Sequence, residues 1–192
     1  MKTSNIAHKS IIRVLLIAAV ILSLPLLAMQ VTSEVVWTLG DFVIAGALLV
    51  GTGLLYEAAV RRAGSLTYRA AVAVALGAGL FLVWAILAVG AIGAEGDPAD
   101  LMYVGVLAMG IVGALIVRLR PEGMARVLLV MALAVVLVAV VALVAGKHLS
   151  PESSVVEIVG VNGFFAALFI GSAWLFRRAA LEQPRAGSAP MV

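Results

Sequence analysis

The segment VLLVMALAVVLVAVVALVAG, residues 127–146, decides the fold of this protein. It lies between Arg126 and Lys147 and contains no charged side chain. A helix of about 20 apolar residues crosses the roughly 30 Å hydrocarbon core of a bilayer. The segment consists mainly of Ala, Val and Leu without period-two alternation, which favours a helix over a strand of an outer-membrane barrel. The sequence therefore predicts a transmembrane helix here.

Five further segments have a similar length and composition. Hydrophobic residues make up 64% of the chain and charged residues 12%, with a mean hydropathy of +1.20. Soluble domains are about 45–50% apolar and about 25% charged. We therefore predict an all-α bundle of six transmembrane helices within residues 1–178 and a flexible tail at 179–192. The other predicted helices cover residues 11–29, 37–56, 70–94, 101–117 and 158–176.

The basic residues predict the orientation of this bundle. Twelve of the thirteen lysines and arginines lie on one side, and Lys147 alone lies on the other. Cytoplasmic loops are enriched in Lys and Arg, so both termini and the connections 57–69 and 118–126 are predicted to be cytoplasmic. The pI near 9.7 thus reflects topology and gives no reason to expect a nucleic-acid partner. Weak attraction of the arginines to anionic lipid of the inner leaflet is a further expectation.

The first segment also resembles a signal peptide. Lys2, Lys9 and Arg13 precede an apolar stretch that contains Pro25. The following residues, LLAMQVTS at 26–33, lack a clean small-x-small cleavage pattern. We therefore expect a retained anchor, whereas cleavage would leave five helices and an external N-terminus.

The spacing of border residues raises the alternative of an internal repeat. Arg13, Arg69 and Arg126 are 56 and 57 residues apart and each precedes an outward-running segment. A pseudo-repeat of three helical hairpins would give this spacing. Evenly spaced loops in any six-helix protein would give it too, and we favour that simpler interpretation.

Four polar residues form a candidate pocket near the outer leaflet: Asp41, Thr52, Asp100 and Asn162. The central turns of the six segments contain no Asp, Glu, Lys, Arg or His. A charge at helix centre costs about 2.5–3.5 kcal/mol and usually marks function, so its absence disfavours an ion-coupled pump. The alternative is that these four side chains only form interhelical hydrogen bonds, worth about 0.6 kcal/mol each. Asp41 would also suit the first turn of its helix, where an acid interacts favourably with the helix dipole.

The stretch GAEGDPADLMY, residues 93–103, has the highest density of acids. Asp97 suits an N-cap, Pro98 the first helical position and Asp100 the third, which predicts a turn and a helix start. A divalent-cation site that includes Glu95 is the alternative. Calcium needs six to eight oxygen ligands and no EF-hand spacing is present, so we predict no metal site.

Motifs for catalysis or for a cofactor are absent from the sequence. The chain has no cysteine, and His8 and His148 are predicted on opposite sides of the membrane, where they cannot jointly ligate a haem. No phosphate-binding loop, zinc-protease motif or nucleophile-elbow motif occurs. We therefore expect a protein that is not an enzyme and that has no cofactor.

Small residues recur at helical spacing and define a candidate helix-packing face. Small side chains let membrane helices approach closely and gain dispersion contacts. This face would serve internal packing, or it would bind a larger membrane complex or a second copy of the chain. We predict an accessory subunit or scaffold, with a small transporter or channel as the alternative. The residues of this face are Gly46, Gly53, Ala71, Ala75, Gly79, Gly105, Gly110, Gly113 and Gly171.

Four stretches resemble a family of small multi-pass bacterial inner-membrane proteins of uncharacterised function. They are GTGLLYE at 51–57, DPADLMYVGVLAMG at 97–110, RPEGMAR at 120–126 and GVNGFFAALFIGSA at 160–173. The resemblance implies a location in the bacterial inner membrane and a multi-pass topology. It implies no activity, substrate or catalytic residues.

Overall fold

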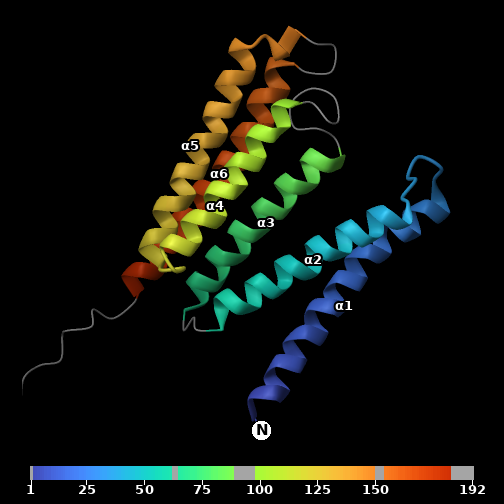
Figure 1. Ribbon diagram of the computed structural model, residues 1–192, viewed down its shortest axis with the longest axis vertical. Coiled ribbons are helices and arrows are strands. Elements are labelled where there is room, and N and C mark those ends of the chain that lie inside the picture. The colour runs from blue at the N-terminus through green and yellow to red at the C-terminus, as the bar shows by residue number, and fades with distance from the viewer. Residues whose placement is uncertain (1, 62–64, 89–97, 150–153, 183–192) are drawn as a thin grey trace, which may run out of the picture. The chain divides into compact units, whose positions relative to one another are not determined.

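The computed structural model describes residues 2–61, 65–88, 98–149 and 154–182. These residues form six α-helices and two short 3₁₀ turns (Figure 1). The 3₁₀ turns are η1 (Pro98–Asp100), before the fourth helix, and η2 (Lys147–Leu149), after the fifth. The helices are α1 (Lys2–Val31), α2 (Leu39–Val60), α3 (Leu66–Ala88), α4 (Leu101–Ile116), α5 (Pro121–Val144) and α6 (Val155–Glu182).

Five of these helices are long and apolar enough to cross a membrane. The exception is α4, which has 16 residues and therefore a length of about 24 Å. The sequence predicted a short fourth helix at nearly these bounds. The predicted all-helical fold is confirmed for the described residues.

Several helix ends differ from the predicted bounds: α1 begins at Lys2 instead of residue 11, and α5 begins at Pro121 instead of residue 127. Contacts in the structure account for two of the differences. Helix α3 begins at Leu66, four residues before the predicted start, because Tyr68 in its first turn is buried and packs edge-on against Phe176. Helix α6 continues to Glu182, so the first four residues of the predicted flexible tail are helical. Their end is fixed because the carboxylate of Glu182 accepts hydrogen bonds from Ser65 and Thr67. Residues 89–94, which the sequence assigned to the third helix, lie outside the described residues.

The chain divides into two compact units, Met1–Arg61 and Arg62–Val192. The first unit is a hairpin of α1 and α2. Gly53 on α2 lies directly against Val14 on α1, and Gly46 lies within van der Waals distance of Leu22. Backbone contact at the glycines therefore replaces interdigitation of large side chains in this hairpin.

The second unit is built around α5 and α6, which pack side by side (Figure 1). Helix α3 packs against α6, and α4 packs against α5. Since α3 is paired mainly with α6 and not with α4, which follows it in sequence, the three-hairpin repeat stays a prediction. The largest fully buried side chains of this unit include Tyr103, Phe165, Phe169, Phe176, Leu82, Ile158 and Val135.

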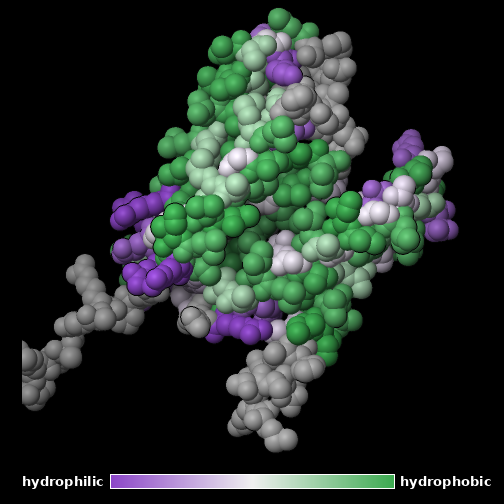
Figure 2. Space-filling model, in the orientation of Figure 1, coloured by the Kyte–Doolittle hydropathy of each residue, from purple (hydrophilic) through white to green (hydrophobic). Residues whose placement is uncertain are grey.

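The outer flanks of the helices are hydrophobic. Figure 2 shows green side chains along the helices of the second unit and purple ones gathered toward the helix ends. On α5, for example, Leu133 is 69% exposed and Leu137 is 61% exposed. A surface of this kind is unfavourable in water and favourable in contact with lipid.

Candidate functional site

A buried polar contact joins α4 to α6. The hydroxyl of Tyr103 donates a hydrogen bond to Asn162 Oδ1 at 2.9 Å, and both residues are fully buried. The Asn162 amide nitrogen donates to the carbonyl oxygen of Ile158, one turn earlier, at 2.8 Å. Asn162 therefore uses both ends of its side-chain amide within the second unit.

Asp100 lies one turn before Tyr103 and is also buried, with 5% of its surface exposed. It occupies the N-cap position of α4 and its side chain makes no capping hydrogen bond. Pro98 and Asp100 are the first and third residues of the helical segment, as predicted, but this first turn is the 3₁₀ turn η1 and the α-helix begins only at Leu101. Asp97 and Glu95 lie outside the described residues.

Asp41 and Thr52 belong to the other unit. Asp41 is exposed and lies in the first turn of α2, as the sequence predicted. Its carboxylate accepts hydrogen bonds from the Thr38 backbone and hydroxyl at 2.7 and 2.8 Å, which completes a capping box. Thr52 is half-buried near the middle of α2. Two of the four candidate pocket residues thus lie in each unit, and the pocket as a whole stays a prediction.

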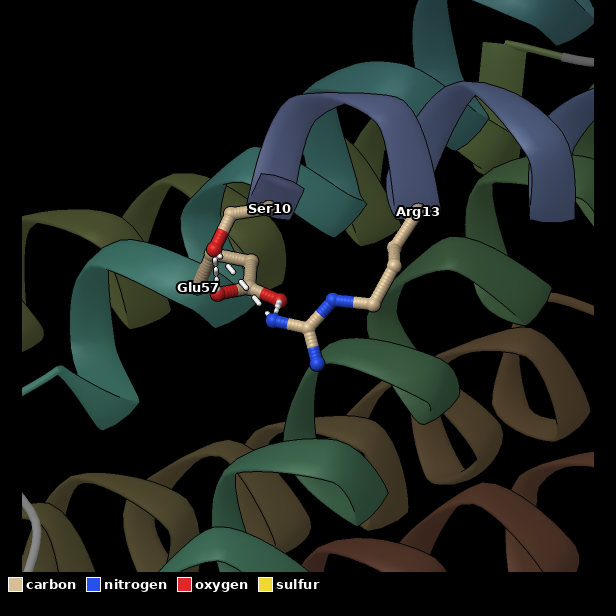
Figure 3. Close-up of polar contacts among 3 residues, drawn as sticks. All are labelled: Ser10, Arg13 and Glu57. Carbon is tan, nitrogen blue, oxygen red and sulfur yellow. Dashed lines mark hydrogen bonds and ion pairs between the residues drawn. The ribbon is translucent and has the colours of Figure 1, made fainter. Parts of the chain in front are cut away.

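A polar cluster in the first unit was not singled out by the sequence. Figure 3 shows Ser10 and Arg13 of α1 pointing toward Glu57 of α2. The Ser10 hydroxyl donates to Glu57 at 2.7 Å, and the Arg13 guanidinium pairs with the same carboxylate at 3.1 Å. The Glu57 side chain is 16% exposed and that of Arg13 is 66% exposed. The sequence did contain a signal for this cluster. Arg13 and Glu57 have opposite charges and lie at the same predicted membrane border of two successive helices.

Two further hydrogen bonds of the second unit link a side chain on one helix to a backbone carbonyl of another segment. Ser172 on α6 donates to the carbonyl oxygen of Ala71 on α3 at 2.8 Å, and both residues are buried. Tyr68 on α3 donates to the carbonyl oxygen of Leu119 in the α4–α5 connection at 3.0 Å. Such bonds cannot be predicted from the spacing of residue types, because every residue has a backbone carbonyl that can act as the acceptor.

Five residues of the candidate helix-packing face fall into two sets. A methyl group added at Gly53, Gly110 or Gly113 would come within 2.7 Å of a side chain on the neighbouring helix. Gly105 and Gly171 have open space at that position and are exposed. The first set lets helices of the same unit approach closely, and the second faces outward. Of the remaining members, Ala71 is fully buried, and Gly79 lies within ordinary contact distance of Leu107.

A cavity of about 720 Å³ lies at the ends of α4, α5 and α6. Its lining includes Arg118, Arg120 and Arg126, together with Glu122 and apolar residues of the helix ends. From the sequence, these arginines are interpreted as markers of topology and as general attractors of anionic lipid. Nothing in the sequence indicates that these three line one cavity and so differ from the other basic residues.

Within the described part of the chain, no group of three or more His, Asp or Glu side chains is placed to hold a metal ion. His148 lies in the η2 turn after α5. Comparisons with protein-family models, with curated proteins and with solved structures found no match. The resemblance to a bacterial inner-membrane family therefore stays a prediction.

Proposed function

We propose that this protein spans the bacterial inner membrane six times with both termini in the cytoplasm, and that it acts by association, as an accessory subunit or scaffold. The observation that carries the proposal is the use of buried polar side chains in the second unit. Asn162 and Ser172 both bond to groups on helices of their own unit, which ties the bundle together. A transport site needs such groups to face a substrate instead.

An exposed aromatic cluster supplies a surface on which a partner would bind. Phe81 and Trp84 on α3 stack with ring centroids 5.5 Å apart, and Phe164 on α6 meets Phe81 edge-on at 5.9 Å. All three are more than 40% exposed. Aromatic side chains dominate the binding energy of many protein interfaces, because they bury large areas with few rotatable bonds. We assign this aromatic cluster as the partner face.

The alternative function is a small transporter or channel, and one observation favours it. Asp100, Tyr103 and Asn162 are all buried near the beginnings of α4 and α6. A buried acid beside a hydrogen-bonded Tyr–Asn pair is a polar group of the kind that would contact a permeating solute.

Affinity purification in a mild detergent, followed by mass spectrometry, tests the main proposal. We expect the full chain to co-purify with a larger membrane complex and to show no solute flux in proteoliposomes. Substituting Trp84→Ala with Phe164→Ala should remove the partner. The control pair Leu133→Ala with Leu137→Ala also removes exposed apolar area, on α5, and should retain it. Flux by the purified chain alone would support the transporter instead.

Cysteine labelling tests the topology, since the chain contains no native cysteine. Single cysteines that replace Arg61 or Arg120 should react with a membrane-impermeant maleimide only after spheroplasts are lysed. Cysteines that replace Glu34 or Leu149 should react in intact spheroplasts. The reverse pattern would contradict the proposed orientation.

A further inference from the structure

The connection between α4 and α5 has an unusual backbone. Arg118 and Leu119 have φ values of 52° and 57°, in the left-handed region that residues with a side chain rarely adopt. The turn is held because Leu119 donates its backbone N–H to Ala114 at 3.1 Å, while its carbonyl accepts the Tyr68 hydroxyl at 3.0 Å. Strained backbone persists where the surroundings fix it, and such places are often functional.

Gly123 closes this turn from the other side. A Cβ atom at Gly123 would lie 2.5 Å from Val117 Cβ, so only glycine lets the start of α5 approach the end of α4 this closely. The close approach and the left-handed residues together place the connection at the edge of the cavity at the helix ends.

The charge of this cavity is positive. Arg118, Arg120 and Arg126 line it against the single acid Glu122, which gives a formal charge of 3 − 1 = +2 for the lining. Among the described residues, the arginines of this cavity form no ion pair with a carboxylate. All three are exposed, so their guanidinium groups are available to a ligand.

The start of α5 adds backbone donors to the same cavity. Pro121 is the first residue of α5, and the backbone hydrogen bond from Met124 to Arg120 closes its first turn. The preceding N–H groups of Glu122 and Gly123 therefore have no partner within the helix. Guanidinium groups beside free amide donors match the oxygens of a phosphate group in charge and geometry.

We propose that this arginine-lined cavity binds the phosphate of an anionic phospholipid headgroup. The inference rests on the membrane insertion proposed above but not on the scaffold role. A lipid is favoured over free phosphate because Ile116 and Val117 also line the cavity, and Ile116 is 75% exposed. Acyl chains would pack on this apolar end of α4 while the headgroup occupies the cavity. The arginines lie on the side predicted to be cytoplasmic, so the lipid belongs to the inner leaflet.

Native mass spectrometry of the full-length protein in mild detergent tests this proposal. The probes are phosphatidylglycerol, zwitterionic phosphatidylethanolamine and inorganic phosphate, each titrated separately. We expect phosphatidylglycerol to bind more tightly than phosphatidylethanolamine and to raise the unfolding temperature. Substituting Arg118→Gln with Arg126→Gln should weaken phosphatidylglycerol binding about tenfold, as expected for the loss of charge-assisted hydrogen bonds.

Two further variants separate the cavity from general surface charge. Arg69→Gln with Arg177→Gln removes the same charge from exposed positions that do not line the cavity, and this pair should retain binding. Glu122→Gln removes the acid of the cavity and should tighten binding. A destabilised variant would lose binding, so a gain in affinity cannot result from misfolding.

Three results would overturn the proposal: equal affinity for the anionic and zwitterionic lipids, equal loss of binding in both arginine pairs, or displacement of phosphatidylglycerol by equimolar phosphate. The last result would identify a soluble phosphate ligand. Failure to find a protein partner would leave these measurements unaffected, so the two proposals fail independently.

Discussion

Tyr103 and Asn162 form a hydrogen bond of 2.9 Å between α4 and α6, and neither side chain is accessible to the surroundings. Because both groups are buried, the loss of either side chain leaves the remaining oxygen, the Tyr103 hydroxyl or Asn162 Oδ1, without this hydrogen bond in an apolar environment. This contact is therefore a sensitive polar position of the second unit.

The first prediction concerns this contact. Tyr103→Phe removes only the hydroxyl, so we expect the free energy of unfolding to fall by about 1 kcal/mol, within the range of interhelical hydrogen bonds in membrane proteins. Unfolding in mixed detergent micelles, followed by circular dichroism, measures the change. Tyr56→Phe on α2 is the control, since no hydrogen bond of its hydroxyl is found among the described residues. Equal destabilisation by both variants would contradict the assigned role of Tyr103.

The second prediction compares two glycines of α4. Gly113→Ala brings a methyl group within 2.7 Å of Val127, whose branched side chain has little freedom to move. We expect a loss of about 1–3 kcal/mol, typical of overpacking. Gly105→Ala meets no atom within 4 Å, so it should leave stability unchanged or raise it by up to about 1 kcal/mol, because Ala has the higher helix propensity. The same unfolding assay distinguishes them, and similar values for the two variants would be inconsistent with close packing of α4 on α5.

The third prediction tests the α1–α2 hairpin by crosslinking. A Cβ atom at Gly53 lies 3.4 Å from Val14 Cβ, close to the separation of about 3.5–4.5 Å found in disulfides. Val14→Cys with Gly53→Cys should therefore oxidise rapidly and shift mobility on a non-reducing gel after cleavage of an engineered protease site in residues 32–37.

The matched control is Val14→Cys with Gly51→Cys. Gly51 has no neighbouring atom within 4 Å of an added Cβ, so its cysteine should remain reduced under the same conditions. Crosslinking of the control pair at the same rate would show that the hairpin does not have the described register.

The fourth prediction ranks the members of the Ser10–Arg13–Glu57 cluster. Glu57→Gln should weaken the α1–α2 pairing more than Arg13→Gln does. Glu57 accepts bonds from both partners and is largely buried, whereas Arg13 is 66% exposed. Exposed ion pairs contribute about 0–1 kcal/mol, and the bond from Ser10 remains when Arg13 is replaced. The crosslinking rate of the Val14–Gly53 cysteine pair measures both effects, and a larger effect of Arg13→Gln would reverse the ranking.

The sequence by itself determined the helical elements. Residues 127–146 are apolar over a full membrane thickness, and the structure places Pro121–Val144 in a helix that is long and apolar enough to cross. Chemistry local to one segment also sufficed for the first turn of α2, where Thr38 and Asp41 cap each other across three residues. Length, composition and capping act within a single segment and can therefore be predicted from it.

The tertiary structure alone decided which helices meet. Tyr103 and Asn162 are 59 residues apart, and no spacing rule relates them. The same holds for Ser172, whose acceptor is a backbone carbonyl on α3. In the sequence, all the arginines at the helix ends are equivalent markers of topology. The structure distinguishes three of them, because the α4–α5 turn brings them around one cavity. The physical reason is that lipid tails and helix faces are both apolar, so no hydrophobic driving force selects one helix face over another. Helix pairing therefore depends on shape and on single polar contacts, which the sequence pattern does not reveal.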